Sequence, residues 1–69
     1  MSEIFCVRLR ECRTRMNKTQ IEVAKETEIV YRTYRRYECG EMSPTLEPLV
    51  KLADYFNVSL DYLTGRTDE

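Results

Sequence analysis

The sequence predicts an all-α fold. Apolar residues recur at spacings of three and four, as on one face of a helix, and no stretch alternates apolar and polar residues like a half-buried strand. Residues with capping side chains precede the apolar stretches, and glycine or asparagine follows them. The 69 residues are enough for one domain. We expect it to span residues 1–69, with a core at about 4–65 and a polar C-terminal tail at 66–69.

The first two helices are separated by a short break. An apolar stripe at i, i+4, i+7 and i+11 predicts the first helix and consists of Phe5, Leu9, Cys12 and Met16. After the break, TQIE has the form of a capping box, in which Thr19 and Glu22 each accept a hydrogen bond from the other's amide. This predicts a short second helix through about Glu26, followed by a polar turn at Thr27 and Glu28.

Residues 30–38, VYRTYRRYE, bring three tyrosines and three arginines together in a chain of net charge −1. At about 100° per residue, Val30, Tyr34 and Tyr37 share a narrow arc, which predicts the buried stripe of a third helix ending at Gly40. The opposite arc carries Tyr31, Arg32, Arg35 and Arg36. Guanidinium groups suit phosphate oxygens and the guanine edge. The alternative is an ordinary solvated face, supported by an ion pair from Glu28 to Arg32.

Two further helices are expected toward the C-terminus. Thr45 is placed to cap the fourth helix, whose expected buried stripe consists of Leu46, Leu49, Val50, Ala53 and Phe56. Asn57 should end this helix. Ser59 should cap a last short helix before Gly65.

Charge is unevenly distributed along the chain. Residues 1–38 hold nine Lys or Arg against six Glu, whereas residues 39–69 hold two basic residues against six acidic ones. Such asymmetry is weak evidence for a polyanionic partner. No apolar run approaches the roughly 18 residues of a membrane span, and the N-terminus has no secretory pattern. We therefore expect a cytoplasmic protein without a membrane partner.

The cysteines do not indicate a metal site or a disulfide framework. Cys6, Cys12 and Cys39 are odd in number and lack C-x-x-C spacing, and histidine is absent. We expect them to serve as small apolar or surface residues. We expect no metal and no cofactor.

Five motifs in order resemble the Cro/phage-repressor-type helix-turn-helix family, also called xenobiotic-response-element-like. They are RLRECR (8–13), TQIEVA (19–24), RYECG (36–40), SPTLEPLVKLADYF (43–56) and VSLDYLTG (58–65). Each motif alone is weak, but together they cover nearly the whole chain at the family's spacing. The resemblance implies a five-helix lambda-repressor-like DNA-binding domain, with the helix-turn-helix formed by helices 2 and 3.

The resemblance also implies residue roles. Gln20 would bond a phosphate and brace the recognition helix, residues 31–38; its alternative is a simple exposed first residue of a helix. The residues expected to face bases are Tyr31, Arg32 and Arg35. Those expected on phosphate are Thr33 and Arg36, with Lys18, Arg8 and Arg10 as further electrostatic candidates. Glu38 would be a structural acid paired with Arg13. The remaining structural residues are Ala24, which allows a close helix approach, and Ile29, Tyr34 and Tyr37 in the core.

Three positions depart from the family's pattern. Glu28 stands where the turn usually has glycine, so a non-glycine residue would take a left-handed conformation at a cost of about 1 kcal/mol. Val30 replaces the polar cap of the recognition helix. Lys18 replaces a leucine, whose place Met16 would fill.

The sequence therefore predicts a sequence-specific regulator of transcription that binds double-stranded DNA, acts as a repressor and forms a homodimer on an inverted-repeat operator. The alternative is a protein-interaction module, antitoxin-like or adaptor-like, that uses the acidic C-terminal half or exposed Ile21, Leu60 and Tyr62. An enzyme is not expected, because there is no histidine, no glycine-rich phosphate loop and no pairing of a nucleophile with a base.

Overall fold

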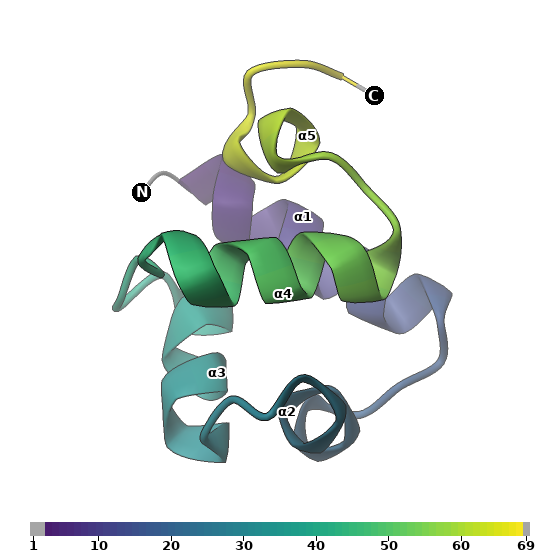
Figure 1. Cartoon of the computed structure of the whole chain (residues 1–69), viewed down its shortest axis with the longest axis vertical. Helices are drawn as coiled ribbons and strands as arrows, with labels where there is room; N and C mark the ends of the chain where they lie inside the picture. The colour runs from purple at the N-terminus through teal and green to yellow at the C-terminus, as the bar shows by residue number, and fades with distance from the viewer. Residues whose placement is uncertain (1–2, 69) are drawn as a thin grey trace.

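The computed structural model describes residues 3–68, which form five α-helices and no strand (Figure 1). The helices are α1 (Glu3–Arg15), α2 (Gln20–Thr27), α3 (Tyr31–Cys39), α4 (Leu46–Phe56) and α5 (Leu60–Thr64). The all-α prediction is confirmed. Residues 1, 2 and 69, which belong to the expected domain and its tail, lie outside the described residues. Within residues 3–68, no helix is both long and apolar enough to cross a bilayer.

The helices pack across one another rather than side by side. In Figure 1, α2 is seen along its axis while α3 runs vertically beside it, and α4 crosses in front of α1. α1 contacts both α3 and α5, and α2 contacts both α3 and α4. The second and third helices therefore meet as a crossed pair joined by a short turn.

Every helix contributes a fully buried side chain to one core. Leu9, Val23, Tyr34, Leu52 and Leu63, one from each helix, are all 0% exposed. Because no helix buries its apolar face alone, the orientation of each helix depends on the others.

Capping side chains begin two of the helices as predicted. The Glu22 amide donates to the Thr19 hydroxyl at 3.1 Å, and the Thr19 amide donates to the Glu22 carboxylate at 2.8 Å, which completes the capping box of α2. Ser59 accepts from the Tyr62 amide at 2.9 Å and begins α5. Thr45 occupies the cap position of α4, but its side chain makes no capping bond, so that part of the prediction is wrong.

Four apolar residues expected in the core are exposed. Met16 lies beyond the end of α1 and is 41% exposed. Val30 is the extended cap residue before α3 and is 70% exposed, because it does not share the helical rotation of Tyr34 and Tyr37. On α4, Leu46 and Val50 are exposed and Leu52, absent from the predicted stripe, is buried. The apolar face of α4 is therefore rotated from the predicted stripe.

Thr27 was expected in a polar turn but is the last residue of α2. Its side chain is buried, and its hydroxyl donates to the Val23 carbonyl at 2.7 Å. The donated bond satisfies the hydroxyl inside the core, so the helix continues one residue past Glu26.

Glu28 has the left-handed conformation expected where the family has glycine. Its φ is +60°, and its amide closes the C-terminus of α2 by donating to the carbonyls of Ala24 and Lys25. A side chain at this φ strains the backbone, whereas glycine does not. Asn57 closes α4 in the same way at φ +57°.

Glu28→Gly should therefore raise the free energy of unfolding by about 1 kcal/mol, measured by urea denaturation. Asn57→Gly is the matched control. It should gain less, because asparagine tolerates the left-handed region better than glutamate. Equal changes at the two positions would contradict this explanation.

Candidate nucleic-acid interface

A buried carboxylate joins three helices. Glu38, near the end of α3, is 2% exposed. It accepts hydrogen bonds from Arg13 of α1 at 2.7 and 3.0 Å, from the Gln20 amide of α2 at 3.0 Å and from the Tyr34 hydroxyl. These donors hold α3 against α1 and against the first residue of α2. The structure thus contains the pairing of Arg13 with Glu38 that the resemblance implies.

This carboxylate is charged despite its burial. Burial raises the pKa of Glu38, but hydrogen bonds from Arg13, Tyr34 and Gln20 outweigh that effect and hold the pKa below its ordinary value of 4.5. Burial and the hydrogen bond to Glu38 both raise the pKa of Tyr34. Among the described residues, no buried side-chain nitrogen or oxygen lacks a partner. The network is therefore fully satisfied.

The opposite face of α3 carries positive charge without compensation. Arg32, Arg35 and Arg36 are exposed, and none of their guanidinium groups forms an ion pair or hydrogen bond within residues 3–68. The alternative ion pair from Glu28 to Arg32 is thus not present. Glu38 is the only acidic residue of α3, and it is buried on the other side of the helix. The outward face of α3 consequently offers guanidinium donors to a partner.

Two arginines of α1 are engaged within the domain instead. Arg8 donates to the carbonyls of Tyr62 and Thr67 and lies 4.3 Å from the centre of the Tyr62 ring. Arg10 donates to the Glu38 carbonyl at 3.3 Å. Arg8 therefore holds the C-terminal segment against α1. Its guanidinium group is used within the domain and is not placed to contact DNA, the role that the sequence left open for it.

An open hollow lies where the N-termini of α2 and α3 approach each other. Its lining residues are Arg13, Lys18, Thr19, Gln20, Ile21 and Tyr31. The first amides of a helix have no carbonyl partner within it, and the helix dipole makes that end positive. The Lys18 Nζ lies 3.4 Å from a Glu26 carboxylate oxygen in an ion pair near the surface. This pair uses one of the three N–H donors of the ammonium and leaves the others. The side-chain amide of Gln20 donates one of its two hydrogens to Glu38, and the second hydrogen remains for another acceptor.

Three further residues that the sequence singled out are buried or half-buried. Thr33 is half-buried at the side of α3, while Ala24 is buried and Ile29 packs partly against the core. The resemblance implied that Gln20 braces the recognition helix, but neither its bond to Glu38 nor the bond from Tyr34 to Glu38 was predicted. The second had a signal in the i, i+4 spacing of the two residues.

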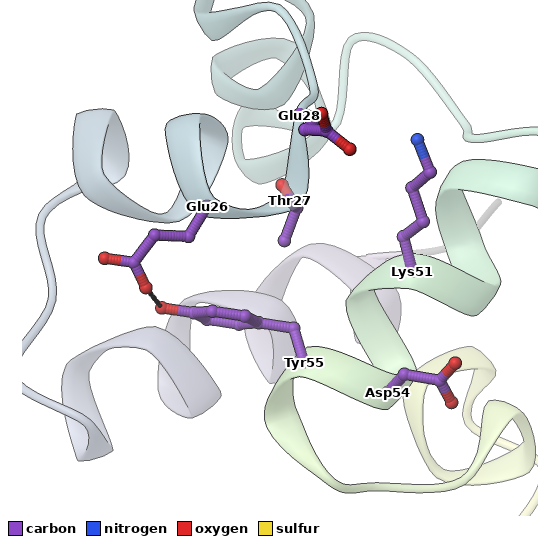
Figure 2. A pocket seen from close by; sticks show the side chains of 6 residues that line it. All are labelled: Glu26, Thr27, Glu28, Lys51, Asp54 and Tyr55. Carbon is purple, nitrogen blue, oxygen red and sulfur yellow. Dashed lines mark hydrogen bonds between the residues drawn. The ribbon is translucent and has the colours of Figure 1, made fainter.

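A second hollow, between the C-terminus of α2 and α4, has the opposite character (Figure 2). It is lined by Glu26, Thr27, Glu28, Lys51, Asp54 and Tyr55. The Tyr55 hydroxyl donates to Glu26; burial and this bond raise the pKa of Tyr55 to about 12. Three carboxylates beside one ammonium repel a polyanion. A nucleic acid is therefore favoured on the side of α3 and the N-terminus of α2.

The crossed pair α2 and α3, the turn at Glu28 and the basic outward face define a helix-turn-helix domain. A helix-turn-helix family model matches residues 9–63. The chain belongs to this family, which confirms the resemblance seen in the sequence.

The chain is similar in sequence to proteins named as regulators or repressors of transcription. The chain is 48% identical over 64 residues to the cryptic phage CTXphi transcriptional repressor RstR of Vibrio cholerae serotype O1, covering 90% of this chain and 57% of that protein. It is 41% identical to AnsR and 36% identical to ImmR, HTH-type transcriptional regulators of Bacillus subtilis, over 86% and 88% of this chain and 51% and 48% of theirs. The chain thus spans about half the length of these relatives. No solved structure matches it.

Glu38→Gln should lower the free energy of unfolding by about 3 kcal/mol near pH 7, because it leaves Arg13 without its charged partner. The folded-state pKa of Glu38 is lowered, so its stabilisation is complete above about pH 4.5 and is lost as pH falls through the folded value. The difference between wild type and variant should therefore shrink below about pH 4.5, measured by urea denaturation across pH.

The matched control is Glu47→Gln, at an exposed position of α4. It should change stability by less than about 0.5 kcal/mol at every pH. A difference for Glu38→Gln that stays constant down to about pH 3 would contradict the assigned charge state.

Proposed function

We propose that this domain binds double-stranded DNA in a sequence-specific manner and represses transcription by occupying promoter DNA. The observation that carries the proposal is the uncompensated basic face of α3, held in place by the Glu38 network. The similarity to RstR, a transcriptional repressor, and to ImmR, a transcriptional regulator, supports it. Residues 31–38 would lie in the major groove, with α2 across the sugar–phosphate backbone.

In this proposal, the residues divide by position on α3. Tyr31, Arg32 and Arg35 contact base edges, where an arginine forms two hydrogen bonds to guanine. Thr33 and Arg36 contact phosphates. Thr33 is half-buried at the side of the helix. The other side chains of this set are exposed: Tyr31, Arg32, Arg35 and Arg36.

A further phosphate would sit in the hollow before α2. The first amides of α2 that the capping box leaves free, the remaining side-chain amide hydrogen of Gln20 and the Lys18 ammonium would donate to it. Because Gln20 also bonds Glu38, this phosphate contact would set the depth at which α3 enters the groove.

One such domain buries little DNA surface, so we propose a two-fold homodimer on an inverted-repeat operator. Its place of action would be the cytoplasm, together with the promoter. The alternative protein-interaction role has less support than the sequence indicated. Leu60 and Tyr62 are half-buried against the core, and the Arg8 guanidinium covers the Tyr62 ring; of the three expected apolar residues only Ile21, 61% exposed, is well exposed.

Selection of bound duplexes from a random pool should yield a defined operator. Its affinity should fall at least a hundredfold between about 50 and about 200 mM salt, because phosphate contacts release counterions. The measurement is a fluorescence anisotropy titration at several salt concentrations. A flat salt response, or a pool that never converges, would contradict the proposal.

Arg32→Ala and Arg35→Ala should each weaken binding to the selected duplex by about 1–3 kcal/mol, with a smaller effect on a random duplex. Gln20→Ala should weaken binding to both duplexes similarly. The control is Arg66→Ala, since Arg66 is exposed beyond α5 and pairs with Asp61. If the two arginine variants affected both duplexes alike, the base contacts would be wrongly assigned.

A further inference from the structure

The start of α3 exposes two apolar side chains, Val30, which the sequence predicted to be buried, and Tyr31, which it placed on the outward face. Val30 is 70% exposed and Tyr31 is 41% exposed. Ile21, in the first turn of α2, is 61% exposed and lines the same hollow as Tyr31. Val30 adjoins Tyr31 in the chain and Tyr31 shares the hollow with Ile21, so we call these three residues the apolar edge of the motif.

The Val30 side chain contributes little to the stability of the domain. Val30 occupies the cap position of α3, and its side chain offers the helix amides no acceptor. Serine, threonine or asparagine there would supply one. A valine that is both exposed and a poor cap points to a contact outside the chain.

The surroundings of the edge select its partner. It continues directly into the basic face of Arg32, Arg35 and Arg36, so the partner must carry negative charge beside an apolar group. Two other exposed apolar pairs lie on other helices, Ile4 and Val7 on α1 and Leu46 and Val50 on α4, and neither helix places three unpaired guanidinium groups beside its pair.

We propose that Ile21, Val30 and Tyr31 contact the 5-methyl group of a thymine in each operator half-site. This inference rests on the proposed function. The thymine methyl is the apolar group that base edges present in the major groove, and the first residues of a recognition helix are those that meet base edges. The apolar edge thus adds a thymine preference to the guanine preference of the arginines.

The test replaces thymine by uracil, one position at a time, in the duplex selected from the random pool. Uracil keeps the O4 acceptor and the pairing with adenine but lacks the methyl group. Burying one methyl contributes about a fourfold change in affinity, so one position in each half-site should lose about fourfold. 5-Bromouracil, whose bromine is close in size to a methyl group, should restore binding at that position.

A variant assigns the effect to the edge. Val30→Ser removes the apolar side chain and supplies the missing cap, so the domain should remain at least as stable by urea denaturation. Its preference for the thymine duplex over the uracil duplex should fall below fourfold, because only Ile21 and Tyr31 remain to contact the methyl group. Leu46→Ser is the matched control: Leu46 is 68% exposed at the start of α4, and its variant should keep the fourfold preference.

The outcomes separate this inference from the proposed function. If a defined operator is selected but contains no thymine in its half-sites, or if every uracil substitution is neutral, the inference is overturned while sequence-specific binding stands. A preference that stays unchanged at fourfold in Val30→Ser also overturns it. If no operator is selected, both fail.

Discussion

The structure depends on one buried charge. Glu38 receives donors from three helices, and all of them are satisfied only when α1, α2 and α3 meet in one arrangement. Removing two charges from water costs free energy, so the pair between Arg13 and Glu38 is a weak source of net stability. Its contribution is geometric: it sets how α3 stands against α2. Because Gln20 belongs to the same network, the start of α2 is coupled to α3.

That arrangement divides the arginines of the chain by task. Three arginines of α1 form hydrogen bonds within the domain: Arg8 bonds the C-terminal segment, and Arg10 and Arg13 bond Glu38 near the end of α3. The arginines of α3 make no such bonds among the described residues. A chain of net charge −1 therefore presents a strongly basic surface on one side, while the acidic hollow beside α4 lies elsewhere (Figure 2). Local distribution, and not net charge, decides which partner fits.

The sequence predicted well what is local. The capping box at Thr19, the left-handed Glu28 and the helix stop at Gly40 follow from backbone chemistry within a few residues, and all are present. Val30 was misplaced because periodicity assigns a face only to residues inside a helix, and Val30 stands just before one. Leu46 was misplaced because the neighbouring helices decide which face of α4 is buried, and that face includes Leu52 in place of Leu46. The hydrogen bonds of Arg8 were not predicted for the same reason, because its partners lie more than 50 positions away in the sequence.

The central claim is that the side of the molecule formed by α3 and the start of α2 meets DNA. The most direct measurement is the change in backbone amide NMR shifts when the selected duplex is added to the labelled domain. The account predicts shifts concentrated at residues 18–21 and 30–36, with small changes in α4 and α5. Shifts concentrated on α4 and α5, with the recognition helix unaffected, would contradict it.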